Sequence, residues 1–399
     1  MPDMLSQRFA STVRVAYLSY DGALDPLGAT QVVPYLEGLA RRGVIFELIT
    51  FEKPSRLREA DRLASMRTRL ARSGMTWHPL RYHKSPRVPA TLFDVVNGAR
   101  CLRRVARGSK LDLFHCRGDI TPLMVRLSRL AGPLLLDMRG FFSDERVDAG
   151  SWAAGSILDK AVRAMERQNL RRATRIVTLT ERGRDVLRGR GVDLPIDVIP
   201  TCVDCDQFVS RLDGSEADFD IVYFGSLGGW YMTREMLDFV DEIRKRGDPI
   251  RALFLTNTVD AATLSRLDQA GVTVKMAPPE QVPNWLSQCR SAFFFIRATP
   301  SKIASCPTKL AEALAMGLPV LTGPGVGDVD EILRRENVGF VLDDFSRESF
   351  WRGWKAMTVL LKDPQTPARC RSVALGRLSL TRGVACYERV YEQMGRAAE

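Results

Sequence analysis

Short apolar runs alternate with longer segments of helical spacing along this chain, and this alternation constrains the fold more than any other feature. The first half has six strand candidates, at residues 13–20, 44–51, 111–118, 133–140, 174–180 and 196–200. The second half has six more, at residues 219–226, 250–257, 272–277, 291–297, 318–323 and 338–342. Strands that alternate with helices predict parallel βαβ units. Runs that are apolar throughout, such as IVYFG and AFFFI, indicate strands covered by helices on both faces.

Two sets of strands predict two doubly wound α/β domains that face each other across a cleft. The polar, turn-forming segment 201–218 is the expected linker. This interpretation gives an N-terminal Rossmann-like domain at 1–200, a C-terminal one at 201–375, and a last helix within 376–399 whose return to the first domain stays open. Because ligands of such sheets bind at the carboxyl ends of the strands, we expect the functional residues directly after them.

The composition excludes several classes of protein. No apolar run approaches the roughly 20 residues that a transmembrane helix needs, and the N-terminus lacks the pattern of a secretory signal. The eight cysteines are scattered, with a single CxxC spacing at 202–205. These features predict a soluble cytoplasmic protein with reduced thiols.

Positive charge is concentrated in the first half of the chain. Residues 1–200 contain 34 Lys and Arg against 21 Asp and Glu, a net charge of +13 in a chain whose total is +11. The segment 53–72 carries seven of these cations, and its apolar residues recur at helical intervals from Leu57 to Leu70. It is either a solvated surface helix or a patch for anionic lipid headgroups or a phosphorylated acceptor. No nucleic-acid-binding pattern is present, so we expect no nucleic acid partner.

Glycine-rich loops follow the first strand of each predicted domain. In the first domain Gly22 and Gly28 flank a loop that leads into a helix near residue 29, and it could hold a hydroxyl-rich or anionic ligand or be a plain turn. In the second domain the loop 225–229 reads GSLGG and includes Gly225, Ser226 and Gly228. Such a loop can cradle a diphosphate, although no P-loop lysine follows, and a flexible turn is the alternative.

The segment 297–323 is the most informative one for chemistry. Ser305 is the expected helix cap, and Ser305, Thr308 and Glu312 share one helical face. A carboxylate at the position of Glu312 can accept hydrogen bonds from two sugar hydroxyls at once.

Three cations gather at the same corner, as a pyrophosphate site needs: Arg297, Lys302 and Lys309. The alternative is a surface ion pair between Lys309 and Glu312.

Taken together, these segments resemble retaining nucleotide-sugar glycosyltransferases of family 4, which have the GT-B architecture. The resemblance rests on SYDGALDPLGATQVV, LLLDMRGFFSDERVDAGSW, TLTERGRDVL with DVIPTCVD, YFGSLGGWY and SCPTKLAEALAMGLPVL. It implies two Rossmann-like domains, an acceptor bound mainly to the first, a nucleoside-diphosphate sugar bound mainly to the second, and no obligatory metal.

The resemblance also implies roles for particular residues. Glu312 matches the second glutamate of the family's E-x7-E motif, which holds the donor ribose, whereas Ala304 stands where the first glutamate is expected. Gly225 and Ser226 match the loop under the donor phosphates. The arginine and lysine common in that loop are missing, and we infer that the three cations at 297–309 replace them.

On the acceptor side, four residues follow predicted strands and are candidate catalytic residues. His115 could hydrogen-bond the transferred sugar or be structural. Arg139, Asp144 and Glu145 could orient acceptor hydroxyls or form a salt-bridged loop.

The sequence therefore predicts a retaining hexosyltransferase-type enzyme that transfers a sugar from a nucleoside-diphosphate donor to a hydroxyl acceptor in polysaccharide, glycolipid or other glycoconjugate biosynthesis. No cofactor or metal is expected. The acceptor is a glycan, a lipid-linked molecule or another alcohol, and the basic first domain suggests a peripheral position on the inner face of an anionic membrane. The alternatives are a nucleotide-sugar epimerase or hydrolase of the same fold and an inert nucleotide-sugar-binding subunit.

Overall fold

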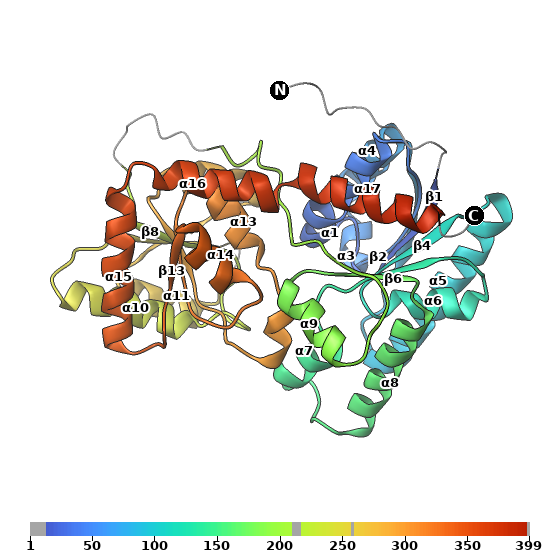
Figure 1. Ribbon diagram of the computed structural model, residues 1–399, viewed down its shortest axis with the longest axis horizontal. Coiled ribbons are helices and arrows are strands. Elements are labelled where there is room, and N and C mark those ends of the chain that lie inside the picture. Colours follow the sequence, from blue (N-terminus) through green and yellow to red (C-terminus); the bar gives the residue numbers. More distant parts are fainter. Residues whose placement is uncertain (1–12, 210–216, 257–258, 397–399) are drawn as a thin grey trace. The chain divides into compact units, whose positions relative to one another are not determined.

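The computed structural model describes residues 13–209, 217–256 and 259–396 (Figure 1). The chain forms two compact units. The first consists of the residues up to Pro200 together with those from Gly383 onward, and the second spans Thr201–Arg382. The two units are described separately below.

The first unit is built on a seven-stranded parallel sheet with the order β3-β2-β1-β4-β5-β6-β7. Strand β1 lies in the interior of this order and its residues are almost completely buried. The strands are β1 (Arg14–Ser19), β2 (Ile45–Glu52), β3 (Thr76–Arg81), β4 (Leu113–Arg117), β5 (Leu134–Asp137), β6 (Arg175–Thr178) and β7 (Ile196–Val198).

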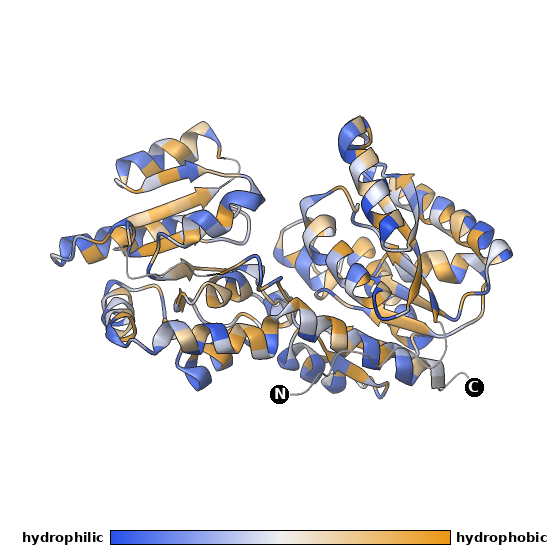
Figure 2. Cartoon of the chain, turned by 90° about the horizontal axis from the view of Figure 1, so that it is seen from above, coloured by the Kyte–Doolittle hydropathy of each residue, from blue (hydrophilic) through white to orange (hydrophobic). Residues whose placement is uncertain are grey.

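Helices connect these parallel strands. Figure 2 shows strands that are largely hydrophobic and helices on which hydrophobic and hydrophilic residues alternate, as expected when each helix covers the sheet with one face. The helices of this unit are α1 (Pro26–Gln31), α2 (Val33–Ala40), α3 (Pro54–Leu57), α4 (Ala60–Arg72), α5 (Arg87–Gly108), α6 (Thr121–Ser128), α7 (Phe142–Asp148), α8 (Ile157–Arg172), α9 (Glu181–Gly189) and, from residue 383 onward, α17 (Leu380–Arg396).

The second unit has a six-stranded parallel sheet with the order β10-β9-β8-β11-β12-β13. Its core is rich in phenylalanine; Phe239, Phe293 and Phe295 are fully buried and contact one another. The strands are β8 (Ile221–Phe224), β9 (Ala252–Thr256), β10 (Thr273–Met276), β11 (Ala292–Phe294), β12 (Val320–Thr322) and β13 (Gly339–Val341).

The helices of the second unit cover this sheet. They include 3₁₀ turns at Pro279–Gln281 and Pro300–Ala304 and a π-helical turn at Ala374–Leu378. The α-helices are α10 (Thr233–Lys245), α11 (Ala261–Gln269), α12 (Val282–Leu286), α13 (Thr308–Ala315), α14 (Val329–Glu336), α15 (Arg347–Lys362) and α16 (Thr366–Val373).

The predicted doubly wound α/β fold is confirmed, and each of the twelve predicted strands overlaps an observed one. Strand β3 was not predicted. It lies at the edge of the first sheet, its residues are only half-buried or exposed, and it contains Pro79. An edge strand needs no continuous apolar run and tolerates proline, so the signal used for the other strands is missing here.

The basic segment 53–72 forms two helices instead of the single predicted one, α3 and α4. On α4, Met66 and Leu70 are buried. Several of the cations pair with carboxylates; Arg56 and Arg62 contact Glu59. The contacts of this segment fit the surface-helix alternative.

Part of the predicted linker belongs to the structure of the second unit. Val203 is buried and its amide donates to the carbonyl of Leu378, while residues 210–216 lie outside the described part of the chain. The last helix begins at Leu380, and its residues from Gly383 onward belong to the first unit.

None of the helices in the described residues combines the length and the apolar character that crossing a lipid bilayer requires.

Candidate functional site

Gly225 is the first residue after β8, and its backbone requires glycine. Its φ angle is +117°, a conformation that other residues rarely adopt. A Cβ atom at this position would lie 2.6 Å from the ammonium nitrogen of Lys309. The missing side chain therefore brings the strand end of β8 directly against a lysine on α13.

Lys309 is almost fully buried, and its ammonium group faces aromatic rings. Its Nζ lies 3.8 Å from the centre of the Tyr231 ring and 5.5 Å from that of Tyr223. Such a cation–π contact is worth about 2 kcal/mol when it is shielded from water. Within the described residues Lys309 forms no ion pair, so the structure does not support the alternative of a surface pair with Glu312.

Lys302 makes a similar contact with the ring of Trp230, which directly precedes Tyr231 in the loop after β8. It lies in the 3₁₀ turn after β11, and its Nζ is 3.9 Å from the centre of the Trp230 ring. Its carbonyl accepts a hydrogen bond from the amide of Gly327, in the loop after β12. Loops from three neighbouring strands therefore hold this lysine in place.

Backbone hydrogen bonds join the loops after β8 and β11. The amide of Arg297 donates to the carbonyl of Trp230, and the amide of Met232 donates to that of Phe295, each at 2.9 Å. We call this arrangement the lysine corner and define it by Gly225, Trp230, Tyr231, Lys302 and Lys309. The side chain of Arg297 is exposed beside it.

Glu312 lies on α13 one turn after Lys309. Burial raises the pKa of its carboxyl group to about 7, and the charge of Lys309 opposes this rise. Its carboxyl group therefore titrates near neutral pH.

The helix begins differently from the prediction. Helix α13 starts at Thr308 with Pro307 as its N-cap residue, and no side chain caps it. Ser305 precedes the helix in an extended conformation, so the expected Ser305 cap is wrong. Ser305 and Thr308 are both half-exposed near the start of α13.

The other predicted loop residues are exposed. Ser226 accepts a hydrogen bond from the Tyr223 hydroxyl through its carbonyl oxygen. The amide of Gly228 donates to the hydroxyl of Thr233 at 3.2 Å, so this amide is already bound within the loop.

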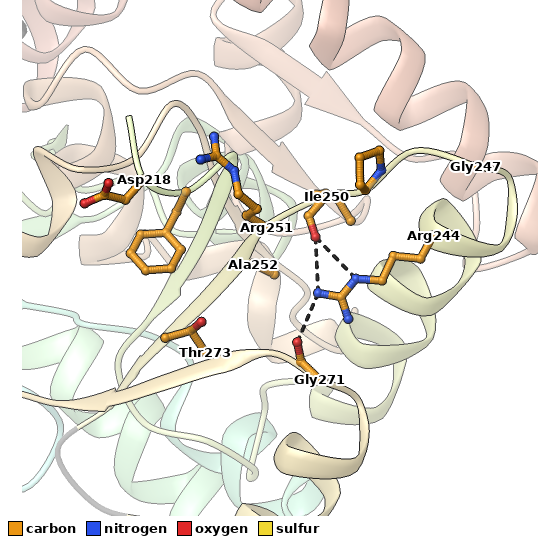
Figure 3. Close-up of a pocket in the computed structure, with 10 residues that line it drawn as sticks. Asp218, Arg244, Gly247, Ile250, Arg251, Ala252, Gly271 and Thr273 are labelled. Carbon is orange, nitrogen blue, oxygen red and sulfur yellow. Dashed lines mark hydrogen bonds between the residues drawn. The ribbon is translucent and has the colours of Figure 1, made fainter. Parts of the chain in front are cut away.

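A hollow in the second unit lies at the opposite ends of the strands of its sheet (Figure 3). It has a volume of about 580 Å³ and is lined by residues at the amino ends of β8, β9 and β10. There the guanidinium group of Arg244 donates to the carbonyls of Ile250 and Gly271. Because ligands of parallel sheets bind at the carboxyl ends, the lysine corner is the candidate functional site.

In the first unit, the predicted acceptor-side loop between Gly22 and Gly28 makes tight contacts within its own backbone. A Cβ atom on Gly28 would lie 1.9 Å from the carbonyl oxygen of Gly22, so this glycine permits a tight backbone contact. The carboxylate of Glu52, at the end of β2, accepts hydrogen bonds from the amides of Ala23 and Leu24 at 2.7 and 3.1 Å. The amides of Ala23 and Leu24 in this loop are thus already bound, and helix α1 begins at Pro26, earlier than predicted.

His115 is buried, with partners at both ring nitrogens. Nδ1 lies 2.7 Å from the hydroxyl of Tyr391, on α17, and Nε2 lies 3.4 Å from Asp137. Burial lowers the pKa of His115 despite the nearby carboxylate, which favours the neutral ring. This geometry fits the structural alternative for His115.

Arg139, Asp144 and Glu145 do not form one cluster of ligand-facing groups. Arg139 lies 3.5 Å from the carboxylate of Asp137. Asp144 pairs with Arg163 and Arg190 at 2.8 and 2.9 Å, as in the salt-bridged-loop alternative. The Glu145 carboxylate packs against Gly140, where it would lie 2.8 Å from a Cβ atom.

Sequence reasoning missed Trp230, Tyr231 and Asp137. The two aromatic residues directly follow the GSLGG loop, and an aromatic pair at a glycine-rich strand end is a usable signal. Asp137 ends β5 inside a run of apolar residues, LLLDM, where a single buried carboxylate has no pattern of its own.

Within the described ranges, no group of three or more His, Cys, Asp and Glu side chains is arranged to hold a metal ion.

Comparison with known proteins bears on both units. Residues 28–202 match the family model described as a glycosyl transferase 4-like domain, somewhat less than half of the chain. No curated protein sequence matches the chain significantly.

Solved structures resemble the chain over nearly its whole length. Sucrose-phosphate synthase from Thermosynechococcus elongatus has a TM-score of 0.71 at 14% identity and covers 96% of this chain and 100% of its own. HepE from Anabaena, in complex with UDP and glucose, has a TM-score of 0.67 at 13% identity, with coverages of 95% and 99%. A glycosyltransferase from Rickettsia africae has a TM-score of 0.67 at 11% identity, with coverages of 96% and 98%. The chain has the GT-B fold, and its first unit is similar to a glycosyl transferase 4-like domain.

Proposed function

We propose that this chain is a retaining glycosyltransferase that moves a hexose-type sugar from a nucleoside-diphosphate donor to a hydroxyl acceptor. The observation that carries the proposal is the contact between Lys309 and the Gly225 loop at the carboxyl end of β8. It is supported by the GT-B fold, by the glycosyl transferase 4-like match in the first unit, and by the complexes of HepE with UDP and UDP-glucose.

The lysine corner suits a leaving diphosphate. When the bond between sugar and phosphate breaks, negative charge grows on the phosphate while the sugar becomes oxocarbenium-like. Fixed positive groups at that position lower the barrier because they need no rearrangement during the reaction. We assign this role to Lys309 and Lys302, with Arg297 and the backbone around Gly225 and Ser226 completing the site.

Glu312 is the proposed anchor for the ribose of the donor. In its ionised form the carboxylate accepts hydrogen bonds from two adjacent hydroxyls, and these charge-assisted bonds are stronger than neutral ones. In the proposed retaining mechanism the leaving phosphate oxygen takes the proton of the acceptor hydroxyl, so no separate side-chain base is required. No metal has a role in this proposal.

The acceptor is proposed to bind the first unit, and the protein is proposed to be cytoplasmic, with an anionic membrane surface as a partner of this basic unit. Polysaccharide, glycolipid and other glycoconjugate synthesis are the pathways that such a reaction serves.

The first test compares donor binding by two lysine variants. In Lys309→Met we expect the dissociation constant for a nucleoside diphosphate to rise about ten- to hundredfold, as for a lost hydrogen bond to a charged group. Lys355→Met is the matched control, because Lys355 also lies over an aromatic ring, that of Trp351, at 4.2 Å, but on α15. Calorimetric titration with UDP, GDP and ADP measures both variants, and equal affinities in the two would contradict the assignment.

The second test measures the reaction itself. A labelled nucleotide sugar incubated with an alcohol acceptor should yield a glycoside with the donor's anomeric configuration. Release of free sugar or a changed sugar on the nucleotide, without an acceptor, would instead support the hydrolase or epimerase alternative.

One observation favours an inert binding subunit as the second candidate. Ala304, at the position of the family's first glutamate, is buried and has no functional group to contact the donor sugar. Donor binding without turnover across a broad acceptor panel would favour this candidate.

A further inference from the structure

Three large apolar side chains are exposed at the start of α5, in the first unit. They are Val88, Leu92 and Phe93, with 47%, 57% and 51% of their surfaces exposed. Val88 and Leu92 are one helical turn apart and therefore lie on the same face of the helix. Single exposed apolar residues are common, but a group of three within six residues is a candidate interaction surface.

Exposed cations lie directly before these side chains in the chain. Arg81 ends β3, Lys84 follows it, and Arg87 is the first residue of α5. In the described part of the chain none of the three forms an ion pair. We call the surface made by Arg81, Lys84, Arg87, Val88, Leu92 and Phe93 the α5 patch.

The helix α4 differs from this patch. Its Arg62 pairs with Glu59, and its Arg69 binds Glu37 through two hydrogen bonds of 2.7 and 2.8 Å. These pairs neutralise part of the positive charge of α4. The charge of the α5 patch is therefore the more available of the two.

Buried hydrogen bonds hold the α5 patch in a fixed place. The fully buried carboxylate of Asp94 accepts from the amide of His83 at 3.0 Å and contacts its ring at 2.6 Å. The same carboxylate accepts from the hydroxyl of Tyr20 at 3.0 Å. Phe93 packs edge-on against the His83 ring, at 4.9 Å between centroids.

These contacts tie the α5 patch to the acceptor side of the first unit. Tyr20 directly follows β1 and precedes the loop that contains Gly22 and Gly28. Its ring also contacts Tyr82, at the end of β3, at 5.5 Å. The patch is thus anchored beside the carboxyl ends of β1 and β3, where ligands of this sheet are expected.

We propose that the α5 patch binds the surface of a bilayer that contains anionic phospholipids. Val88, Leu92 and Phe93 enter the boundary between headgroups and acyl chains, and Arg81, Lys84 and Arg87 contact the lipid phosphates. Apolar side chains flanked by cations match the chemistry of this boundary, where phosphates lie directly above hydrocarbon. The net charge of +13 on residues 1–200 adds a long-range attraction to such a surface.

Charge argues against a second copy of this chain as the occupant. A symmetric dimer through the α5 patch would bring identical surfaces together, and the three cations of each copy would then face those of the other. An anionic lipid surface has the complementary charge.

The consequence for the reaction rests on the proposed transferase function, whereas bilayer binding itself does not. When the protein is docked through this patch, the carboxyl ends of β1 and β3, on the proposed acceptor side, lie next to the headgroups. The inferred acceptor is therefore an alcohol carried on a lipid in the membrane.

The test is flotation of the full chain with vesicles of phosphatidylcholine alone or with about one third phosphatidylglycerol. We expect binding only to the anionic vesicles, and a loss of binding at high salt. The variant Leu92→Glu/Phe93→Glu and the variant Lys84→Glu/Arg87→Glu should each bind about tenfold or more weakly, since each basic residue near the surface contributes about a factor of five.

Two controls separate this surface from general effects. Arg58→Glu/Arg72→Glu changes the net charge by the same amount as Lys84→Glu/Arg87→Glu, at two exposed arginines near or on α4, and it should reduce binding much less than the α5 variants. Val359→Glu replaces an exposed apolar residue of the second unit and should have no effect. Melting temperature and affinity for a nucleoside diphosphate should stay unchanged in all variants.

The proposal is overturned if the wild-type chain ignores anionic vesicles, or if the α5 variants bind them as well as the Arg58→Glu/Arg72→Glu control does. It is also overturned if the α5 variants instead convert a dimer to a monomer in solution. Failure of donor binding with intact vesicle binding would contradict only the transferase proposal.

Discussion

Lys309 shows how one residue can hold a positive charge ready for an anion. Its ammonium group is almost fully buried, but its near neighbours are the rings of Tyr231 and Tyr223 and the backbone of Gly225. A carboxylate in direct contact would neutralise the charge, whereas a ring attracts the cation without neutralising it, and in the described residues Lys309 has no such ion pair. An incoming diphosphate therefore meets a cation that is positioned in advance.

Glu312 makes donor binding depend on pH in a predictable direction. Burial raises the pKa of this carboxyl group to about 7, so it is mostly protonated at pH 6 and mostly ionised at pH 8. Only the ionised form accepts hydrogen bonds with both oxygens. The affinity for a nucleoside diphosphate should therefore rise close to tenfold between pH 6 and pH 8, in proportion to the ionised fraction.

Calorimetric titration across this range checks the prediction. In Glu312→Gln the dependence on pH should disappear, because an amide does not titrate, and the affinity should stay low throughout. Glu331→Gln, an exposed position on α14, is the control and should keep the wild-type profile. A wild-type affinity that is flat from pH 6 to pH 8 would remove Glu312 from the donor site.

For individual residues, the sequence could predict which residues lie at strand ends but not which side chains they contact in space. The cations at 297–309 and the glycines at 225–229 were found from the pattern, because strand ends carry ligand-binding residues. The partners of His115 could not be found, because Tyr391 and Asp137 are 276 and 22 residues away in the chain.

Helix α17 is the element that contributes most unexpectedly to the first unit. Its Tyr387 and Tyr391 reach a buried polar network at β4 and β5, where Tyr387 donates to Asp137 at 3.0 Å. Burial alone would raise the pKa of Asp137, but Arg139, His115 and Arg117 together hold it well below its usual range. The carboxylate is thus the shared partner of two arginines, a histidine and the last helix.

Replacement of Asp137 by asparagine should strongly destabilise the first unit. The change leaves the buried cations of Arg117 and Arg139 without their carboxylate, which typically costs about 3–5 kcal/mol. Hydrogen exchange measured by mass spectrometry should show faster exchange in α17 and β5. Asp197→Asn is the control, since its pair with Arg175 is partly exposed and worth about 1 kcal/mol or less.

The contribution of Asp137 to the stability of the first unit should also depend on pH. Because its pKa is lower in the folded state, its stabilisation is complete at neutral pH and is lost only as the pH falls below about 4. If hydrogen exchange in α17 and β5 is equally slow in the Asp137→Asn and Asp197→Asn variants, Asp137 does not anchor α17.

Helices and strands could be predicted where burial produces a strong hydrophobic pattern in the sequence. The interior strands of both sheets are apolar throughout and were found, whereas β3 is half-buried and was missed. Helix α13 was found, but its start was placed too early, because Pro307 follows a 3₁₀ turn that the sequence does not distinguish from a helical turn.

For the whole molecule, the sequence predicted two parallel-sheet α/β units, and the GT-B fold agrees with this. It could not predict which loops are open, because that depends on contacts between distant strands. The loop with Gly22 and Gly28 is an example: Glu52, from the end of the next strand, binds the amides of Ala23 and Leu24 within this loop.

The most direct test of the central claim is a crystal structure of the chain soaked with a nucleoside diphosphate. We predict that the diphosphate lies against Gly225, with a phosphate oxygen in hydrogen-bonding contact with the Nζ of Lys309. A diphosphate bound at the opposite ends of the strands of the same sheet, beside Arg244 and Arg251 in the hollow of Figure 3, would contradict the account.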